Sequence, residues 1–284
     1  MVVFAGQGDA RRSMALLWRA TGAGDARAVP GPKPALSVDA IVAAGIEIAD
    51  ADDMGALSMR AVGARLGRTA MALYTYVPSK AELVDLMHDR VLAELPADYP
   101  TADGWRPAIT AWAGDTWAFY LRHPWVLQIS QARPVLGPGE YRQLETVVRI
   151  LRATGLEPTA LRRVIGVLFQ FVRATARVAA EARRAAPETG VPDEEWWSGR
   201  SALLAEVAPD FAERFPALAA LEAGAADRAG EGGEDGAEPA DAAVPYLENE
   251  ARETFLAGLT LILDGIDTSV AKEAGGRASV EIVR

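Results

Sequence analysis

The sequence predicts an all-α fold, and three observations support this. Apolar residues recur at helical spacing in most segments, as at Ile41, Gly45 and Ile48. No segment shows the sustained alternation of apolar and polar residues that marks a half-buried strand. Prolines and glycines separate the periodic segments, for example from Pro134 to Gly139. We therefore expect helices joined by short irregular connections.

Composition narrows the class of protein. The chain has 284 residues, half of them apolar, which suffices for one large or two modest domains. It has no cysteine, which excludes disulfides and thiolate chemistry. No apolar run reaches the roughly 18 residues of a membrane span, and the first residues do not resemble a signal peptide. We expect a cytoplasmic protein without membrane contacts.

The first expected segment is a flexible arm over residues 1–35. It shows no sustained period and ends in VPGPKPA, where prolines and glycine oppose regular structure. A short helix is expected around Met14 to Arg19. Basic side chains outnumber acidic ones in this arm, whereas the whole chain carries a formal charge of -10.

Four helices are expected between residues 36 and 95. Ser37 and Ser58 can cap the first two helices. Gly67 supplies the tight turn into the third, so the second and third form a helix-turn-helix pattern. Ser79 and Glu82 have the spacing of a capping box, which opens the fourth. The expected helices cover 37–50, 58–66, 70–76 and 79–95.

The chain from residue 96 to about 270 is expected to form a second helical domain. Breakers such as His123-Pro124 separate its helices. The acidic, glycine-rich stretch at 223–243 is expected to be disordered, because it cannot bury enough apolar surface. Residues 271–284 are expected to form a tail. The expected helices cover 104–122, 124–131, 138–154, 158–186, 193–207, 209–222 and 245–267.

The third helix has the composition of a helix that enters the major groove of DNA. Leu73 and Val77 lie four residues apart and can pack on the second helix. Small residues at the helix start let its backbone approach base edges. Tyrosine hydroxyls can donate to phosphates, and Lys80 begins the next helix, where anions are attracted. The alternative is that Tyr74 and Tyr76 are half-buried core residues.

These features together resemble the DNA-binding domain of the TetR family of bacterial one-component regulators. The resemblance covers residues 36–95 and lies in ALSMRAVGARLG, LYTYV and SKAEL. The segment from Trp105 to about Ala182 resembles the tetracycline-repressor type of C-terminal domain, through WRPAITAW, RHPW and GEYRQLETVVRILRATGLEP. The resemblance implies an all-helical homodimer with a DNA-binding domain, a linking helix and a ligand-binding domain. It further implies a repressor that a small-molecule effector releases from a palindromic operator in double-stranded DNA.

Carried onto this sequence, the family motif implies particular DNA contacts. Arg60 matches an arginine that can read guanine through its fork of donors. Thr69 and Met71 fall where base edges are contacted, and Lys80 matches a phosphate-binding lysine. Arg68 stands where a small apolar residue is usual, so we expect it to point outward to a phosphate. The expected DNA-binding residues are Ser58, Arg60, Arg68, Thr69, Ala70, Met71, Tyr74, Tyr76 and Lys80.

An effector pocket is expected among the helices of the second domain. Aromatic side chains would form its walls, and a few amides and one guanidinium its polar anchors. A core position is the alternative for each tryptophan. Gln131 falls where the tetracycline repressor, which binds a drug–magnesium complex, has a histidine, so we expect neither a metal nor tetracycline. The expected lining residues are Trp112, Trp117, Trp125, Gln128, Gln131, Phe169, Gln170 and Arg173.

Two long helices, 158–186 and 245–267, carry apolar stripes. In the resembled family, the matching helices of two subunits form a four-helix interface. The alternative is that both stripes face only their own core. The expected interface residues are Val164, Leu168, Phe171, Phe255, Leu259, Ile262 and Leu263.

Enzyme signatures are missing from the sequence, which has no His-Glu-x-x-His, phosphate-binding loop or Gly-x-Ser-x-Gly elbow. We therefore expect no enzymatic activity and no cofactor. The competing hypothesis is a helical small-molecule binding protein or enzyme with a vestigial DNA-binding head. Replacing Tyr74 and Lys80 separates the two hypotheses, because the second predicts intact cellular function.

Overall fold

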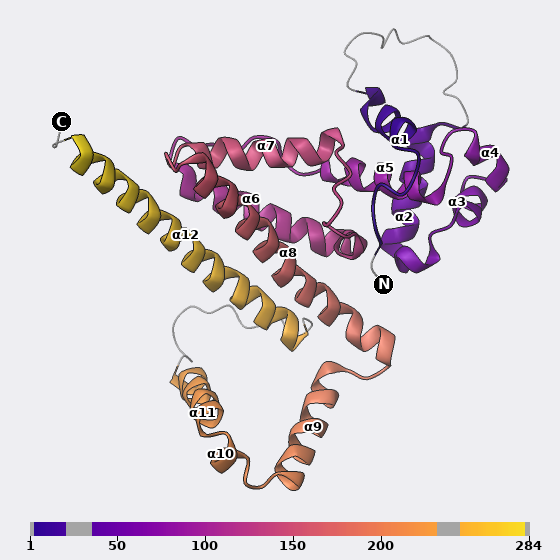
Figure 1. Ribbon diagram of the computed structural model, residues 1–284. Coiled ribbons are helices and arrows are strands. Elements are labelled where there is room, and N and C mark those ends of the chain that lie inside the picture. The colour runs from indigo at the N-terminus through magenta and orange to yellow at the C-terminus, as the bar shows by residue number, and fades with distance from the viewer. Residues whose placement is uncertain (1–2, 21–35, 232–244, 282–284) are drawn as a thin grey trace. The chain divides into compact units, whose positions relative to one another are not determined.

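The computed structural model describes residues 3–20, 36–231 and 245–281, in which every regular element is a helix (Figure 1). The predicted all-α class is confirmed. The chain divides into two compact units, which are described in turn. The first comprises Met1–Arg177 and Phe255–Arg284, and the second comprises Val178–Thr254.

The first unit begins with a three-helix head. Ser37, Ser58 and Thr69 cap its helices, because each side-chain oxygen accepts the backbone N–H three residues ahead. The first two of these caps were predicted. Ile41, Val62 and other fully buried residues such as Leu73 and Val77 form the core of the head. The helices are α2 (Val38–Ala56), α3 (Met59–Arg65) and α4 (Ala70–Tyr74).

The turn between α3 and α4 is set by two glycines. Gly67 has a φ of 63°, the left-handed conformation that glycine adopts without strain. Gly63 lies against the turn, where an added Cβ would stand 2.7 Å from the carbonyl oxygen of Arg68. The Arg68 N–H donates to the Gly63 carbonyl at 2.8 Å and closes the turn. The predicted helix-turn-helix is therefore formed by backbone contacts that need both glycines.

Helix α5 (Lys80–Leu92) links the head to the rest of the unit. Ser79 caps it, as the capping-box spacing predicts. The residues Leu83, Met87 and Val91 are fully buried. Its polar residues Glu82, Asp85 and Asp89 are also buried, which is unusual for carboxylates and requires hydrogen-bond donors from other segments.

An N-terminal strap, residues 3–20, supplies two sets of these donors. The N–H of Gly6 donates to both oxygens of Asp85 (3.0 and 3.2 Å), and the N–H of Asp9 donates to Glu82 (3.2 Å). Within the strap, α1 (Ala10–Leu17) and the 3₁₀ turn η1 (Trp18–Ala20) bury Leu17. The predicted flexible arm is therefore wrong for residues 3–20, because buried carboxylates hold its backbone. Residues 1–2 and 21–35 of the predicted arm lie outside the described residues.

Helices α6, α7, α8 and α12 complete the first unit. Trp112, Phe119 and Leu168 are among their fully buried side chains. The predicted helix at 124–131 is a short 3₁₀ helix, because Ile129 turns extended and pairs with Val3 in an isolated parallel bridge. The predicted tail at 271–284 is wrong up to residue 281, where α12 ends, and the rest lies outside the described residues. The elements are α6 (Trp105–Arg122), η2 (Pro124–Gln128), α7 (Pro138–Arg152), α8 (Pro158–Thr189) and α12 (Tyr246–Glu281).

The second unit holds the end of α8, the start of α12 and three helices between them. Arg183 makes a two-pronged ion pair with the buried Glu248, at 2.7 and 2.6 Å. The predicted helix at 209–222 is divided at Pro216. Helix α11 continues to Glu231, so the predicted disorder at 223–243 is wrong for its first part, and residues 232–243 lie outside the described residues. The three helices are α9 (Asp193–Val207), α10 (Phe211–Arg214) and α11 (Pro216–Glu231).

Candidate DNA-binding surface and effector cavity

The predicted DNA-binding residues lie within residues 58–80, a stretch that contains α3 and α4 and ends at the start of α5 (Figure 1). Eight of the nine are exposed and Ala70 is partly exposed. Met71 is 75% exposed, whereas Leu73 is fully buried, so α4 has one core face and one outward face. Tyr74 and Tyr76 are about two-fifths exposed, at 40% and 38%. Each tyrosine side chain is therefore partly buried in the head and partly accessible to solvent.

This surface has a local charge opposite to that of the whole chain. Residues 58–80 contain four basic residues and no acidic one. Arg65 is paired with Glu47 at 2.6 Å, which leaves Arg60, Arg68 and Lys80 as the remaining basic residues of the stretch. Three positive side chains around a short helix suit a phosphate backbone. The chain's overall negative charge therefore does not oppose DNA binding at this surface.

A cavity of about 460 Å³ lies in the first unit, between α5, α6, α7, α8 and the loop 129–136. Its volume is in the range of sites for drug-sized molecules. Most of its wall is apolar or aromatic, and a smaller set of polar groups is distributed around it. The lining includes His88, Leu92, Tyr120, Ile129, Gln131, Glu140, Tyr141, Gln143, Phe169, Gln170 and Arg173.

Four of the eight predicted pocket residues line this cavity: Gln131, Phe169, Gln170 and Arg173. The other four lie elsewhere. Trp112 is fully buried and contacts Phe169 edge to face, at 5.0 Å between ring centroids. Trp117 packs against Phe255 with tilted rings, at 4.6 Å between ring centroids. Trp125 donates to Asp50, and Gln128 donates to Asp53. The core alternative for the tryptophans is therefore the one that the structure shows.

Several polar groups of the cavity wall already have partners. Arg173 donates to the carbonyl oxygens of Val126, Leu127 and Ile129, at 3.2, 2.8 and 2.7 Å. Gln170 donates to Gln131 at 2.9 Å. These bonds fix the loop that forms one side of the cavity.

The sequence did not single out His88 and Gln143, which also line the cavity. Burial, and then the positive charge of Arg173, lower the pKa of His88 to about 4, so its ring is neutral at physiological pH. His88 and Leu92 lie one turn apart on α5, which could have indicated a shared face. Gln143 carries no such signal, because a glutamine on a polar helix face is ordinarily solvated.

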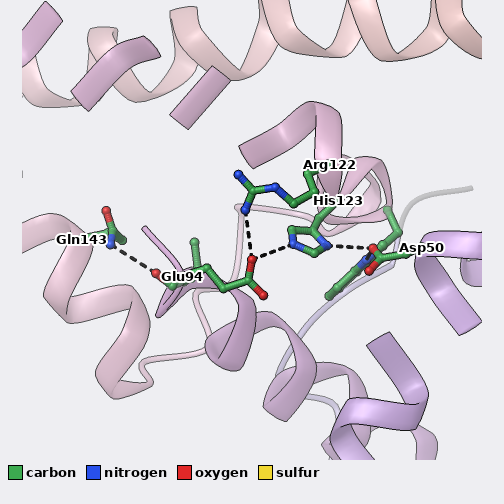
Figure 2. Close-up of polar contacts among 7 residues, drawn as sticks. Asp50, Glu94, Arg122, His123 and Gln143 are labelled. Atoms are coloured by element: carbon green, nitrogen blue, oxygen red, sulfur yellow. Dashed lines mark hydrogen bonds and ion pairs between the residues drawn. The ribbon is translucent and has the colours of Figure 1, made fainter. Parts of the chain in front are cut away.

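His123, which follows α6, joins the helices around the cavity to the head and to the end of the linking helix (Figure 2). Its ring nitrogens lie 2.8 Å from an Asp50 oxygen and 3.0 Å from a Glu94 oxygen. Asp50 belongs to α2, and Glu94 follows α5. Arg122 contacts the same Glu94 oxygen at 3.1 Å. His123 therefore bridges α2 of the head and the end of the linking helix.

Most of the side chains predicted for the dimer interface are buried within their own chain. Leu168, Phe255, Leu259 and Leu263 are buried, which corrects their assignment to a subunit interface. The apolar stripe on each of the helices α8 and α12 is wide, and one side of it packs against the core of the same chain. The predicted residues Val164, Phe171 and Ile262 are partly exposed. Larger apolar exposures on the same two helices occur at Val167, Leu256 and Leu261.

Two further properties concern the described residues as a whole. No group of three or more His, Asp or Glu side chains in the described part of the chain is placed to hold a metal ion. Among those residues, one helical segment, Tyr246–Lys272 of α12, is long and apolar enough to cross a membrane by length and composition.

An exposed helix-turn-helix, joined by one helix to a domain with a drug-sized cavity, defines a one-component DNA-binding regulator. A family model described as tetracyclin repressor-like, C-terminal domain, matches residues 96–234. The HTH-type transcriptional repressor DrrR1 of Streptomyces coeruleorubidus is 38% identical over 275 residues, which is 96% of this chain and 91% of that protein. The chain belongs to the TetR family of transcriptional regulators.

Solved structures share the fold. A TetR transcriptional regulator from Streptomyces coelicolor is 26% identical, with a TM-score of 0.58 over 82% of this chain and 99% of that chain. The Streptomyces coelicolor TetR family protein ActR, in complex with actinorhodin, is 24% identical, with a TM-score of 0.61 over 84% of this chain and 99% of that chain. The helical arrangement described above is therefore that of the family.

Proposed function

We propose that this regulator is a repressor that leaves a palindromic operator when a small organic effector enters the cavity. The observation that carries this proposal is that α5 forms part of the cavity wall, through His88 and Leu92, and part of the head core, through Leu83 and Met87. A ligand that moves α5 must therefore disturb the packing beneath the DNA-binding surface. The relative named a repressor, DrrR1, supports the direction of regulation.

The roles on DNA follow from chemistry and exposure. Arg60 is assigned to a guanine edge, because its guanidinium can donate to O6 and N7 together. Met71 and Ala70 contact thymine methyl groups, and Tyr74, Tyr76 and Thr69 contact bases or phosphates. Arg68 and Lys80 contact phosphates, which position the head without specifying sequence.

The functional form is a homodimer in the cytoplasm, and its interface includes the outward apolar faces of α8 and α12. Leu261 is 72% exposed and Val167 is 52% exposed. Such side chains in the middle of long helices favour burial against a second subunit. Two copies would place their reading helices about 34 Å apart, one turn of DNA, which accounts for a palindromic site. In a dimer of this kind α12 packs against protein, and the chain has no membrane partner and no enzymatic role.

The proposal is tested by selecting bound fragments from genomic DNA with the full-length protein, then mapping the protected site. We expect an inverted repeat, and a compound screen should yield effectors that weaken binding at least tenfold. The double variant Tyr74→Ala, Lys80→Ala should lose the operator and keep the effector. Unchanged repression in cells that carry this variant would instead support the hypothesis of a vestigial head.

A further inference from the structure

Gln143, which lines the cavity, carries an acceptor that no group among the described residues satisfies. Its side chain is 3% exposed, and its Nε2 donates to the Leu92 carbonyl oxygen at 3.2 Å (Figure 2). Because only the nitrogen end of an amide can make that bond, the orientation of the side chain is fixed. The remaining atom, Oε1, is buried and has no hydrogen-bond partner among the described residues.

His88 provides a second such group in the same wall. Its Nδ1 is also buried without a partner in the described part of the chain. The ring is neutral, so one of its nitrogens is an acceptor. Leu92, to which Gln143 is anchored, lies one helical turn beyond His88 on α5. His88 on α5 and Gln143 on α7 thus line the same cavity, and we call these two residues the polar patch.

A buried acceptor without a donor is unfavourable, and a bound molecule that supplies the donor removes this penalty. An ammonium donor is disfavoured, because the guanidinium of Arg173 lies in the wall of the same cavity and would repel it. A carboxylate is disfavoured too, because it has no proton to give to Gln143. A neutral hydroxyl meets both conditions. The rings of Tyr120, Tyr141 and Phe169 supply the surface for a flat apolar body.

We propose that the effector is a neutral, hydroxylated ring compound whose hydroxyl donates to Gln143 Oε1 beside His88. This inference rests on the proposed function for the use of the cavity. The binding that it predicts can be measured without DNA. Because the polar patch includes His88 of α5, an effector held there would act directly on the linking helix.

The test uses the full-length protein and three probes of equal ring size: naphthalene, 2-naphthol and 2-naphthoate. We expect 2-naphthol to bind roughly tenfold more tightly than either of the others by calorimetry, since one added hydrogen bond is worth about a factor of ten. In Gln143→Met, which keeps the volume and removes the acceptor, the preference for 2-naphthol should fall to about twofold or less. The matched control is Gln7→Met, at an exposed glutamine of the N-terminal strap that does not line the cavity, which should keep the tenfold preference.

Folding of each variant is checked by circular dichroism. If Gln143→Met does not fold, because the bond to Leu92 is lost, His88→Phe serves as the second variant and should lower the preference at least threefold. The proposal is overturned if 2-naphthol fails to bind the wild-type protein, or binds it no better than naphthalene or 2-naphthoate. It is also overturned if a folded Gln143→Met keeps the full preference. Binding of 2-naphthol without release of DNA would instead contradict the proposed function and leave this inference standing.

Discussion

His123 stabilises the junction between the head and the effector-side helices through a single ring. It is 4% exposed and bonded at both nitrogens, to Asp50 and to Glu94. His123→Phe keeps the ring packing but leaves both carboxylates without this partner. We expect it to lower the free energy of unfolding by roughly 1–3 kcal/mol in urea titrations, because Asp50 retains Trp125 and Glu94 remains partly in water.

Arg122→Ala is the matched control for that variant, since it removes the exposed partner of the same Glu94. An exposed ion pair is worth about 0–1 kcal/mol, so its loss should be small. Equal losses in the two variants would show that the histidine bridge contributes no more than a surface contact.

The buried carboxyl group of Asp85 should make the free energy of unfolding depend on pH. Burial raises its pKa to about 6, against the lowering effect of the Gly6 N–H, and Glu82 and Glu140 raise it further. The folded state therefore holds this proton more tightly than the unfolded chain does. The resulting stabilisation is present below pH 4 and is lost as the pH rises from about 4 to 6.

Asp85→Asn removes this pH dependence while keeping an oxygen that can accept from Gly6. Relative to wild type, the variant should gain stability between pH 4 and pH 7, by on the order of 1–2 kcal/mol. Urea titrations at both pH values measure the difference. The exposed Asp103→Asn is the control and should show no such gain. A pH-independent difference for Asp85→Asn would contradict the assigned shift.

At the scale of elements, local signals predicted most helices and long-range contacts accounted for the errors. Ser37, Ser58 and Ser79 marked helix starts correctly, because a cap is a short-range hydrogen bond. The N-terminal strap was missed since its order comes from Asp85 and Glu82, more than 70 residues away. The donors in the strap are backbone N–H groups, which leave no signal in the pattern of side chains along the sequence.

The cavity shows the same limit. The aromatic character of a residue could not tell whether it belongs to the core or to the cavity wall. Trp112 is a core residue, whereas Phe169, which contacts Trp112, lines the cavity. Both residues are large and apolar and lie on long helices. Gln143 was missed for the opposite reason, because its burial arises only where α7 meets α5. The DNA-binding surface was easier to predict, since its residues are contiguous in sequence.

The turn between α3 and α4 gives a prediction at the element scale. In Gly63→Ala, the new Cβ would stand 2.7 Å from the Arg68 carbonyl oxygen, so the turn must shift. We expect a destabilisation of roughly 1–3 kcal/mol and a weaker affinity for the selected operator. Gly114→Ala, in the open part of α6, is the control and should be neutral or stabilising by up to about 1 kcal/mol. Wild-type affinity in folded Gly63→Ala would show that the turn tolerates a side chain.

For the whole molecule, the proposed dimer gives the final prediction. Leu261 is 72% exposed in the middle of α12. Leu261→Glu would place a charge in a surface that two subunits bury, and a buried unpaired charge is strongly unfavourable. We expect sedimentation to show monomers at concentrations where the wild type is dimeric.

Operator affinity should fall with the loss of the dimer. Two linked heads bind two half-sites with an avidity of about 10²–10⁴ over one head, so Leu261→Glu should lose on the order of a hundredfold. Phe4→Glu, at an apolar side chain that is 50% exposed but lies on the N-terminal strap, is the control and should remain dimeric. The isolated half-site should bind both proteins equally well, because the helix-turn-helix is unchanged. A dimeric Leu261→Glu with wild-type affinity would place the subunit interface on another face.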